Sequence, residues 1–241
     1  MTAQTLQQRA EIERVVGSRT LCDVFDHTAA EAGDAPAFSN EAGDGWQTLT
    51  WAQAHRQVRE LAAGFVALGL TPGERVALML PNRTEHVLAD LGAVHAGGLG
   101  VTIYATLAPE QIAFVAGDCD ARIAVVDGAG ELARWQPVLS QLPGLKTIIV
   151  RDAAACPPGD PYLTWDAFAA LGKERYAADP DLVSERVAAI TIDDPVALLY
   201  TSGTTGNPKG VLLTHRNVGY ELACAQGMGP VSYTHLRAHE T

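Results

Sequence analysis

The sequence predicts an α/β fold in which a mostly parallel sheet is covered by crossover helices. Residues 76–80 form a continuous apolar run between Pro72 and Pro81, as expected for a strand that is buried on both faces. Other segments carry apolar residues at helical spacing, which is typical of amphipathic helices. The two patterns alternate along the chain, and this alternation favours parallel strands joined by helices.

The expected elements follow from periodicity and from residues that start or stop helices. A helix is expected at 20–32, where Gly33 begins a stop signal, and another follows Thr50, its expected N-cap, and ends near Gly69. Further helices are expected at 84–95, 109–116, 131–141 and 165–171, strands at 101–104, 123–126 and 147–150, and surface excursions at 153–161 and in the charged segment 173–186.

Composition and charge narrow the function classes. The chain has 241 residues, of which 47% are hydrophobic and 19% charged, so it can bury a substantial core. Its 28 acidic and 17 basic residues give a net charge of −11, which disfavours nucleic acid as a partner. A local nest of backbone N–H groups can still hold a phosphate in an acidic protein.

Cysteine usage and hydropathy indicate a cytoplasmic protein. The four cysteines form no C-x-x-C pair, and no histidine lies near them at zinc-ligand spacing. We therefore expect no disulfide framework, no metal site and a reducing environment. Residues 1–20 carry charges where a signal peptide needs an apolar run, and the longest apolar stretch, 61–70, is too short to span a bilayer.

The segment that carries chemistry is 201–210, Thr-Ser-Gly-Thr-Thr-Gly-Asn-Pro-Lys-Gly, which directly follows an apolar run at 195–200 that predicts a buried strand. Glycines let backbone N–H groups turn toward an anion, hydroxyl groups add donors, and Lys209 adds a positive charge. This pattern predicts a phosphate-binding loop. The alternative is a simple turn between two strands, because 211–213 is another short apolar run.

Two better-known nucleotide motifs do not fit the chain. A P-loop of the form G-x-x-x-x-G-K-[S/T] cannot be placed here, since Lys209 is followed by Gly210. The dinucleotide pattern G-x-G-x-x-G is also missing, since Gly98-Leu99-Gly100 is followed by Val101, Thr102 and Ile103.

Residues 200–211, Tyr-Thr-Ser-Gly-Thr-Thr-Gly-Asn-Pro-Lys-Gly-Val, followed by Thr-His-Arg-Asn at 214–217, resemble the signature loop of the adenylate-forming (AMP-binding) superfamily. That superfamily includes acyl-CoA synthetases, adenylation domains and luciferases. The match is unbroken over twelve positions. It therefore implies the N-terminal domain of the adenylate-forming fold.

The likeness extends upstream and points to a subfamily. It covers residues 20–228, and the segment 103–111 is similar to the one that long-chain fatty acid–CoA ligases carry after this strand. Short segments at 49–51, 73–76, 80–82 and 97–98 are also similar to the family's N-terminal domain.

The resemblance implies a reaction and its ligands. Members of the family activate a carboxylate with Mg²⁺ and ATP to an acyl-adenylate, and then transfer the acyl group to the thiol of coenzyme A. The implied substrate is a long-chain fatty acid. By similarity, three kinds of group would hold the β- and γ-phosphates of ATP. The hydroxyl groups belong to Thr201, Ser202, Thr204 and Thr205, and the ammonium group belongs to Lys209. The glycines that allow close backbone approach are Gly203 and Gly206.

The resemblance also indicates which parts of the family's pattern do not occur in the 241 residues. These are a Tyr-Gly-x-Thr-Glu stretch, a Thr-Gly-Asp stretch and a mobile C-terminal domain with a lysine. We therefore expect 1–228 to be a partial N-terminal AMP-binding domain without a catalytic residue, and 229–241 to be a non-native tail. Such a chain is expected to be inactive alone, weakly stable and poorly soluble.

Alternatives stay open at this point. The acyl-adenylate could be passed to a carrier-protein thiol instead of coenzyme A, or the chain could be a non-catalytic module that binds a nucleotide or a partner. Peripheral membrane contact to collect fatty acids is also open, although no basic amphipathic helix supports it.

The remaining polar candidates favour structural roles. Thr214 is the expected N-cap of the next helix, and His215 is expected to be structural. His86 and His95 do not fall at a metal-ligand spacing. The pair Asp193-Asp194 is interpreted as a turn rather than as carboxylates for acid–base catalysis.

Overall fold

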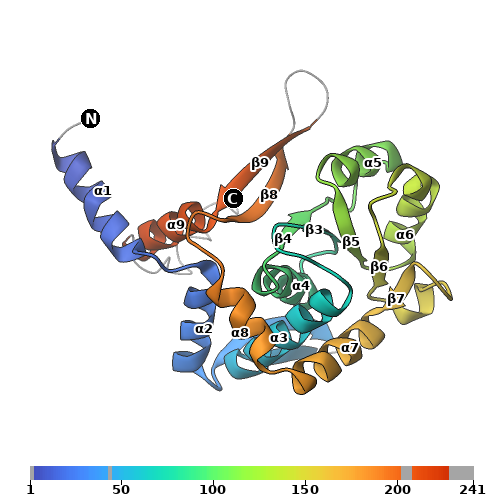
Figure 1. Cartoon of the computed structure of the whole chain (residues 1–241), viewed down its shortest axis with the longest axis horizontal. Helices are drawn as coiled ribbons and strands as arrows, with labels where there is room; N and C mark the ends of the chain where they lie inside the picture. Colours follow the sequence, from blue (N-terminus) through green and yellow to red (C-terminus); the bar gives the residue numbers. More distant parts are fainter. Residues whose placement is uncertain (1–2, 43–44, 202–207, 228–241) are drawn as a thin grey trace.

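The computed structural model describes residues 3–42, 45–201 and 208–227 (Figure 1). Its main sheet consists of β3 (Arg75–Met79), β4 (Leu99–Thr102), β5 (Ala121–Val126), β6 (Thr147–Val150), β7 (Tyr162–Thr164), β8 (Pro195–Thr201) and β9 (Lys209–Thr214). These seven strands lie in the order β7-β6-β5-β3-β4-β8-β9, and only the pair β8 and β9 is antiparallel. The expected α/β class with a mostly parallel sheet is confirmed.

Helices cover both faces of this sheet (Figure 1). One face is covered by α3 (Trp51–Ala67), α4 (Thr84–His95) and α7 (Trp165–Ala178). The other is covered by α5 (Pro109–Asp118), α6 (Ala129–Trp135) and a 3₁₀ helix (Gln136–Gln141). The helix expected at 131–141 is therefore present as an α-helix that tightens into a 3₁₀ helix.

Strand β3 lies at the centre and is buried on both faces. Val76 and Leu78 belong to the core under α3 and α4, whereas Ala77 and Met79 belong to the core under α5 and α6. All four side chains are 0% exposed. Two-sided burial explains why the run is continuously apolar rather than alternating.

Smaller elements surround the main sheet. Strands β1 (Pro36–Ala42) and β2 (Gly45–Thr50) form a separate antiparallel hairpin. The remaining helices are α1 (Ala3–Val16), α2 (Leu21–Ala32), α8 (Asp181–Ala188) and α9 (His215–Gly227), with a 3₁₀ turn at Ala153–Ala155. Helix α1, which the polar N-terminus did not predict, lies against α9 (Figure 1). Among the described helices, none combines the length and the apolar content that crossing a membrane requires.

The predicted starts of α2 and α3 and the predicted end of α2 are confirmed by their hydrogen bonds, whereas α7 continues to Ala178, beyond the expected end at 171. The Thr20 hydroxyl accepts from the Asp23 N–H at 3.2 Å, and the Thr50 hydroxyl accepts from the Gln53 N–H at 3.2 Å. Both are capping boxes, because the side chain of the fourth residue accepts from the N-cap N–H. Gly33 ends α2 with a φ of 49°, a backbone conformation that favours glycine.

The charged segment 173–186 is not a surface excursion, and that prediction is wrong. It contains the second half of α7 and most of α8. Val183 is fully buried, and Tyr176 and Leu182 pack against the same core as α3. The charged residues lie on the outer sides of these helices, and only a few apolar residues face inward. Because charged residues are more numerous in this segment, the sequence pattern did not predict its packing against the core.

Two strand predictions also need correction. Strand β4 begins two residues before the expected 101–104, at Leu99. The run 195–200 forms β8 but is not a buried strand, since only Val196 is buried and Leu199 is 44% exposed. Strand β8 pairs with β4 only at Ala197 and Gly100, and the rest of it pairs with β9 at the edge of the sheet.

A polar cluster under the helices joins α2, α3 and α4. The Asp26 carboxylate contacts His55 Nε2 at 3.2 Å, His95 Nε2 at 3.3 Å and Arg59 Nη1 at 3.4 Å. The other nitrogen of His95, Nδ1, lies 2.7 Å from the Leu91 carbonyl oxygen. The fully buried His95 ring thus lies between two oxygen atoms, one from the backbone of its own helix and one from Asp26. The cluster therefore ties α2 to α3 and α4 through the Asp26 carboxylate.

The substitution Asp26→Asn should lower the free energy of unfolding by about 1.5–3 kcal/mol at neutral pH, because it removes the carboxylate that the two histidines and Arg59 contact. Burial opposes ionisation of Asp26, but the hydrogen bonds from His55 and His95 hold its pKa well below the usual range. A depressed carboxyl pKa stabilises the fold above the unfolded value of about 3.9, and this stabilisation is lost as the pH falls below it. Urea unfolding should therefore show the difference between wild type and variant shrinking from about pH 5 to about pH 3. A difference independent of pH would contradict this account.

Helices α3 and α7 pack closely because each presents a glycine at the contact. A Cβ at Gly64 would lie 2.8 Å from Phe168 Cε2, and a Cβ at Gly172 would overlap the Glu60 carbonyl oxygen. Such a carbonyl belongs to the backbone of α3 and cannot rotate away, so only glycine fits at Gly172.

We expect Gly172→Ala to destabilise the protein by about 1–3 kcal/mol, since the helices must separate to admit a methyl group. The matched control is Gly130→Ala in α6, where a Cβ meets nothing within 4 Å. This control should be neutral or stabilising by up to about 1 kcal/mol. Thermal unfolding of both variants tests the contact, and an equal effect of the two would argue against it.

Candidate functional site

The segment predicted to bind phosphate connects the two strands of the β8–β9 hairpin, which extends from the edge of the sheet (Figure 1). Thr201 is the last residue of β8 and Lys209 the first of β9, and the two are directly paired in the register. The hairpin therefore brings together two of the predicted phosphate ligands. The other five, Ser202, Gly203, Thr204, Thr205 and Gly206, lie outside the described residues.

Thr201 and Lys209 are both exposed. Directly paired residues of an antiparallel ladder have their side chains on the same face, so a hydroxyl donor and an ammonium group lie together at the end of the hairpin. No carboxylate among the described residues forms an ion pair with Lys209. This donor set suits an anion.

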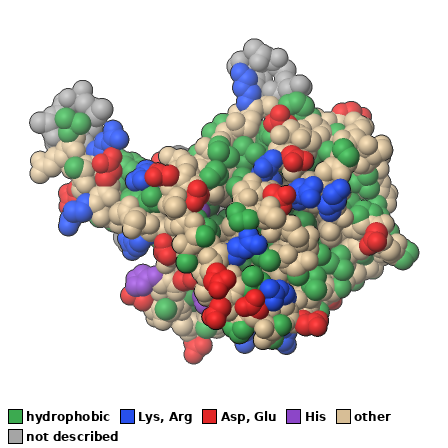
Figure 2. Space-filling model, in the orientation of Figure 1, with side chains coloured by type: hydrophobic (Ala, Val, Ile, Leu, Met, Phe, Trp, Pro, Cys, Tyr) green, Lys and Arg blue, Asp and Glu red, His purple; other side chains and the backbone are tan. Residues whose placement is uncertain are grey.

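The hairpin is attached to the rest of the molecule just before the loop. The Tyr200 hydroxyl donates a hydrogen bond of 2.6 Å to Asp118 Oδ2 at the end of α5. Burial, together with this hydrogen bond, raises the pKa of the Tyr200 phenol above its usual range, so the phenol is the donor. The face of the molecule in Figure 2 carries acidic and basic side chains interspersed. An anion at the hairpin would therefore be held by local donors rather than by a broad basic surface.

Thr214, the last residue of β9, and His215, the first residue of α9, have the structural roles predicted for them. The Thr214 hydroxyl accepts from the Asn217 N–H at 3.3 Å, while Asn217 Oδ1 accepts from the Thr214 N–H at 3.0 Å, which is an N-cap. His215 is 2% exposed, and its Nδ1 accepts from the Leu21 N–H at 2.9 Å. Burial lowers the pKa of His215. Its ring thus links the start of α9 to the start of α2.

The remaining polar candidates are also tied into the fold. Asp193 forms an ion pair with Arg216 at 2.7 Å, and Asp194 Oδ2 accepts from the Thr191 N–H at 2.6 Å, so the two carboxylates serve separate contacts. His86 contacts the Leu80 carbonyl oxygen and the Thr102 hydroxyl, each at 3.2 Å. Within 3–42, 45–201 and 208–227, no three His, Cys, Asp or Glu residues are arranged to hold a metal ion.

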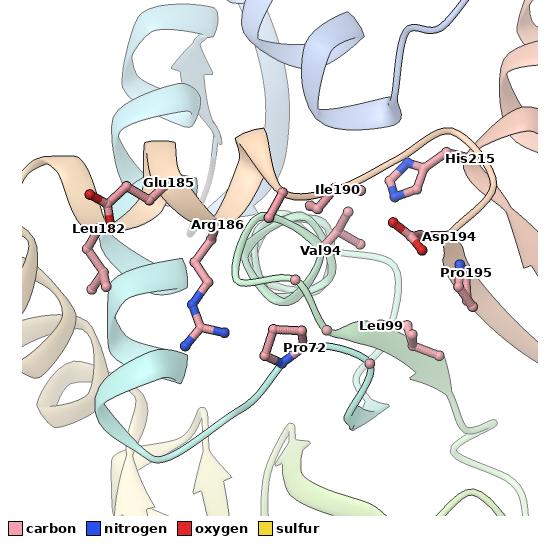
Figure 3. A pocket seen from close by; sticks show the side chains of 14 residues that line it. Pro72, Val94, Leu99, Leu182, Glu185, Arg186, Ile190, Asp194, Pro195 and His215 are labelled. Carbon is pink, nitrogen blue, oxygen red and sulfur yellow. The ribbon is translucent and has the colours of Figure 1, made fainter.

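A pocket of about 520 Å³ opens at the other end of β8, where the strand begins (Figure 3). Figure 3 shows the Arg186 guanidinium pointing toward Pro72, with Asp194 and His215 at the opposite end. Sequence reasoning missed this pocket because it interpreted 173–186 as a surface excursion, whereas α8 forms one of the pocket's walls. The pocket and the predicted phosphate loop are therefore separate features at the two ends of one strand.

Comparison with protein families gives one match over most of the chain. The model of the family described as "AMP-binding enzyme" matches residues 25–239. Among curated proteins, Long-chain-fatty-acid--CoA ligase ACSBG2 of Xenopus laevis is 35% identical over 206 residues, which cover 86% of this chain and 28% of that protein. Long-chain-fatty-acid--CoA ligase FadD15 of Mycobacterium bovis is 30% identical over 185 residues, which cover 77% of this chain and 29% of that protein. The chain thus spans under a third of the length of these relatives.

Solved structures share the fold. An acetoacetyl-CoA synthetase from Streptomyces lividans matches with a TM-score of 0.70 and 22% identity, over 87% of this chain and 32% of that one. The anthranilate CoA ligase AuaEII in complex with anthranoyl-AMP matches with a TM-score of 0.64 and 23% identity, over 83% of this chain and 35% of that one. Sequence identities of this size establish the shared architecture alone.

Proposed function

The chain belongs to the AMP-binding enzyme family. We propose that it is part of an ATP-dependent ligase that converts a long-chain fatty acid to an acyl-adenylate and then to an acyl-CoA. The observation that supports this proposal most directly is the signature loop, whose described ends, Thr201 and Lys209, lie side by side and exposed on the hairpin. Other parts of the nucleotide and acyl sites would come from outside these 241 residues, and the chain alone would be inactive.

The residues at the hairpin fit the polyphosphate of ATP. A hydroxyl, an ammonium group without a described carboxylate partner and a glycine at 210 form a donor set that suits an anion. We infer that Lys209 offsets phosphate charge, and that the hydroxyl groups of Thr201, Ser202, Thr204 and Thr205 donate to the β- and γ-phosphate oxygens. Gly203 and Gly206 would allow the backbone to approach those oxygens closely.

ATP supplies the AMP that removes the negative charge of the carboxylate and the pyrophosphate that leaves, while Mg²⁺ would accompany the nucleotide. The task of the loop is to hold the β- and γ-phosphates in place while their bond to AMP breaks. Donors that are already in place when the nucleotide binds would do this at low entropic cost. Coenzyme A would then accept the acyl group.

The choice of a long-chain fatty acid is supported by the printed names of the curated relatives, which are at least 30% identical to this chain. The fold itself does not select the acyl group, because the structural neighbours are named for acetoacetate and anthranilate. We place the activity in the cytoplasm, where ATP and coenzyme A are available.

The substitution Lys209→Ala should weaken binding of inorganic tripolyphosphate to the chain about tenfold to a hundredfold, because a charge-assisted contact contributes about 1.5–3 kcal/mol. Tripolyphosphate is the suitable probe, since it presents the phosphates without the adenosine. Isothermal titration calorimetry with and without Mg²⁺ measures the effect.

The matched control is Lys173→Ala, which removes an exposed lysine from α7 on another part of the molecule. It should leave the affinity unchanged. Equal loss in both variants would mean that the effect is one of net charge, and unchanged affinity in Lys209→Ala would remove this residue from the site.

A further inference from the structure

We propose that Tyr200 and Asp118 form a positioning pair that holds the end of the β8–β9 hairpin, and with it Thr201 and Lys209, in place for phosphate binding. This inference rests on the proposed function and adds to it a pair of residues, only one of which lies in the signature loop. Neither residue is required to touch the nucleotide.

The contact joins parts of the chain that are far apart in sequence. Tyr200 is the penultimate residue of β8. Its hydroxyl donates a hydrogen bond of 2.6 Å to Asp118 Oδ2, which lies 82 residues away in the sequence. Asp118 is the last residue of α5. Apart from this bond, β8 meets the body of the sheet in register only where Ala197 pairs with Gly100. The tyrosine therefore anchors the hairpin three residues further toward its loop.

The body side of this contact is well fixed. Cys119, next to Asp118, is 3% exposed, and its carbonyl oxygen accepts a hydrogen bond from Arg75 Nε at the start of the central strand β3. Leu198 and Tyr200 pack against the core that α5 shares with α6. Movement of the hairpin end would thus break a hydrogen bond and uncover apolar surface together.

The partner strand is shaped to admit the tyrosine ring. Gly210 lies directly opposite Tyr200, and a Cβ at Gly210 would lie 3.1 Å from Leu198 Cδ1 and 3.4 Å from Tyr200 Cζ. Both distances are at or inside the closest range that side chains normally adopt. The glycine that follows Lys209 therefore leaves the space in which the ring turns toward Asp118.

This arrangement has a direct consequence for binding. Thr201 adjoins Tyr200, and Lys209 pairs with Thr201, so both ligands lie beside the anchored residue. A ligand that binds donors already held in place spends less free energy on ordering them. Loss of the anchor should therefore weaken phosphate binding without removing any phosphate ligand.

The experiment measures tripolyphosphate affinity by calorimetry for Tyr200→Phe, Asp118→Ala and the double variant. Each single change should weaken binding about three- to tenfold, the equivalent of one ordinary hydrogen bond, and the double variant should be no weaker than the singles. Asp118→Asn retains an acceptor oxygen and should restore most of the affinity. Tyr162→Phe on β7, at the far edge of the sheet, is the matched control and should bind as the wild type does.

Hydrogen exchange of the Thr201 and Lys209 amides in the unliganded chain gives a second measurement that does not depend on phosphate. Exchange should rise in Tyr200→Phe and Asp118→Ala and stay unchanged in Tyr162→Phe. If the wild type binds tripolyphosphate and both single variants bind it equally well, the positioning pair is wrong and the proposed function stands. If the wild type does not bind tripolyphosphate, the proposed function fails, and the exchange rates alone decide whether the pair anchors the hairpin. Additive losses in the double variant would also overturn the pairing.

Discussion

Burial of strand β3 on both faces is the constraint on which the rest of this structure depends. A strand whose side chains are all hidden needs a neighbour on each edge and a helical layer on each face. Strands β4 and β5 supply the edges, while α3 and α4 cover one face and α5 and α6 the other. Because parallel neighbours require crossover connections, the chain passes alternately through sheet and helix. The tight contact between α3 and α7 through Gly64 and Gly172 and the Asp26 cluster then hold the helices of one face to one another.

Two-sided burial ends where β8 leaves the sheet. Beyond its pairing with β4 this strand continues with β9 as its partner, and Leu199, Val211 and Leu212 are exposed. The departure places Thr201 and Lys209, the described ends of the signature loop, at the end of a projecting hairpin, where a ligand can approach the hydroxyl and ammonium groups. The position of these two residues depends on side-chain contacts, of which the bond from Tyr200 to Asp118 is the one that reaches the body nearest to them.

Several elements were predictable because their signals are local. Residues 84–95 and 147–150 form the expected helix and strand at the expected bounds, and Thr20, Thr50 and Thr214 cap helices through contacts within three residues. The errors came where the decisive partner lies far away in sequence. The apolar run 195–200 has the composition of a buried strand, but its burial depends on neighbours that β8 meets only near Ala197. The segment 173–186 is rich in charged residues, yet Val183 is buried in the core to which α3 and α4 contribute.

The sequence by itself determined the fold class, several helix ends and the segment proposed to bind phosphate, because periodicity, capping and an unbroken motif are properties of neighbouring residues. Only the tertiary structure decided that Thr201 and Lys209 face each other across an edge hairpin and that Asp118 lies within hydrogen-bond distance of Tyr200. It also decided that His95 is fully buried and contacts Asp26 rather than solvent. Each of these depends on which distant segments are brought together, and that is settled by the packing of the whole sheet and its helices rather than by any one stretch of chain.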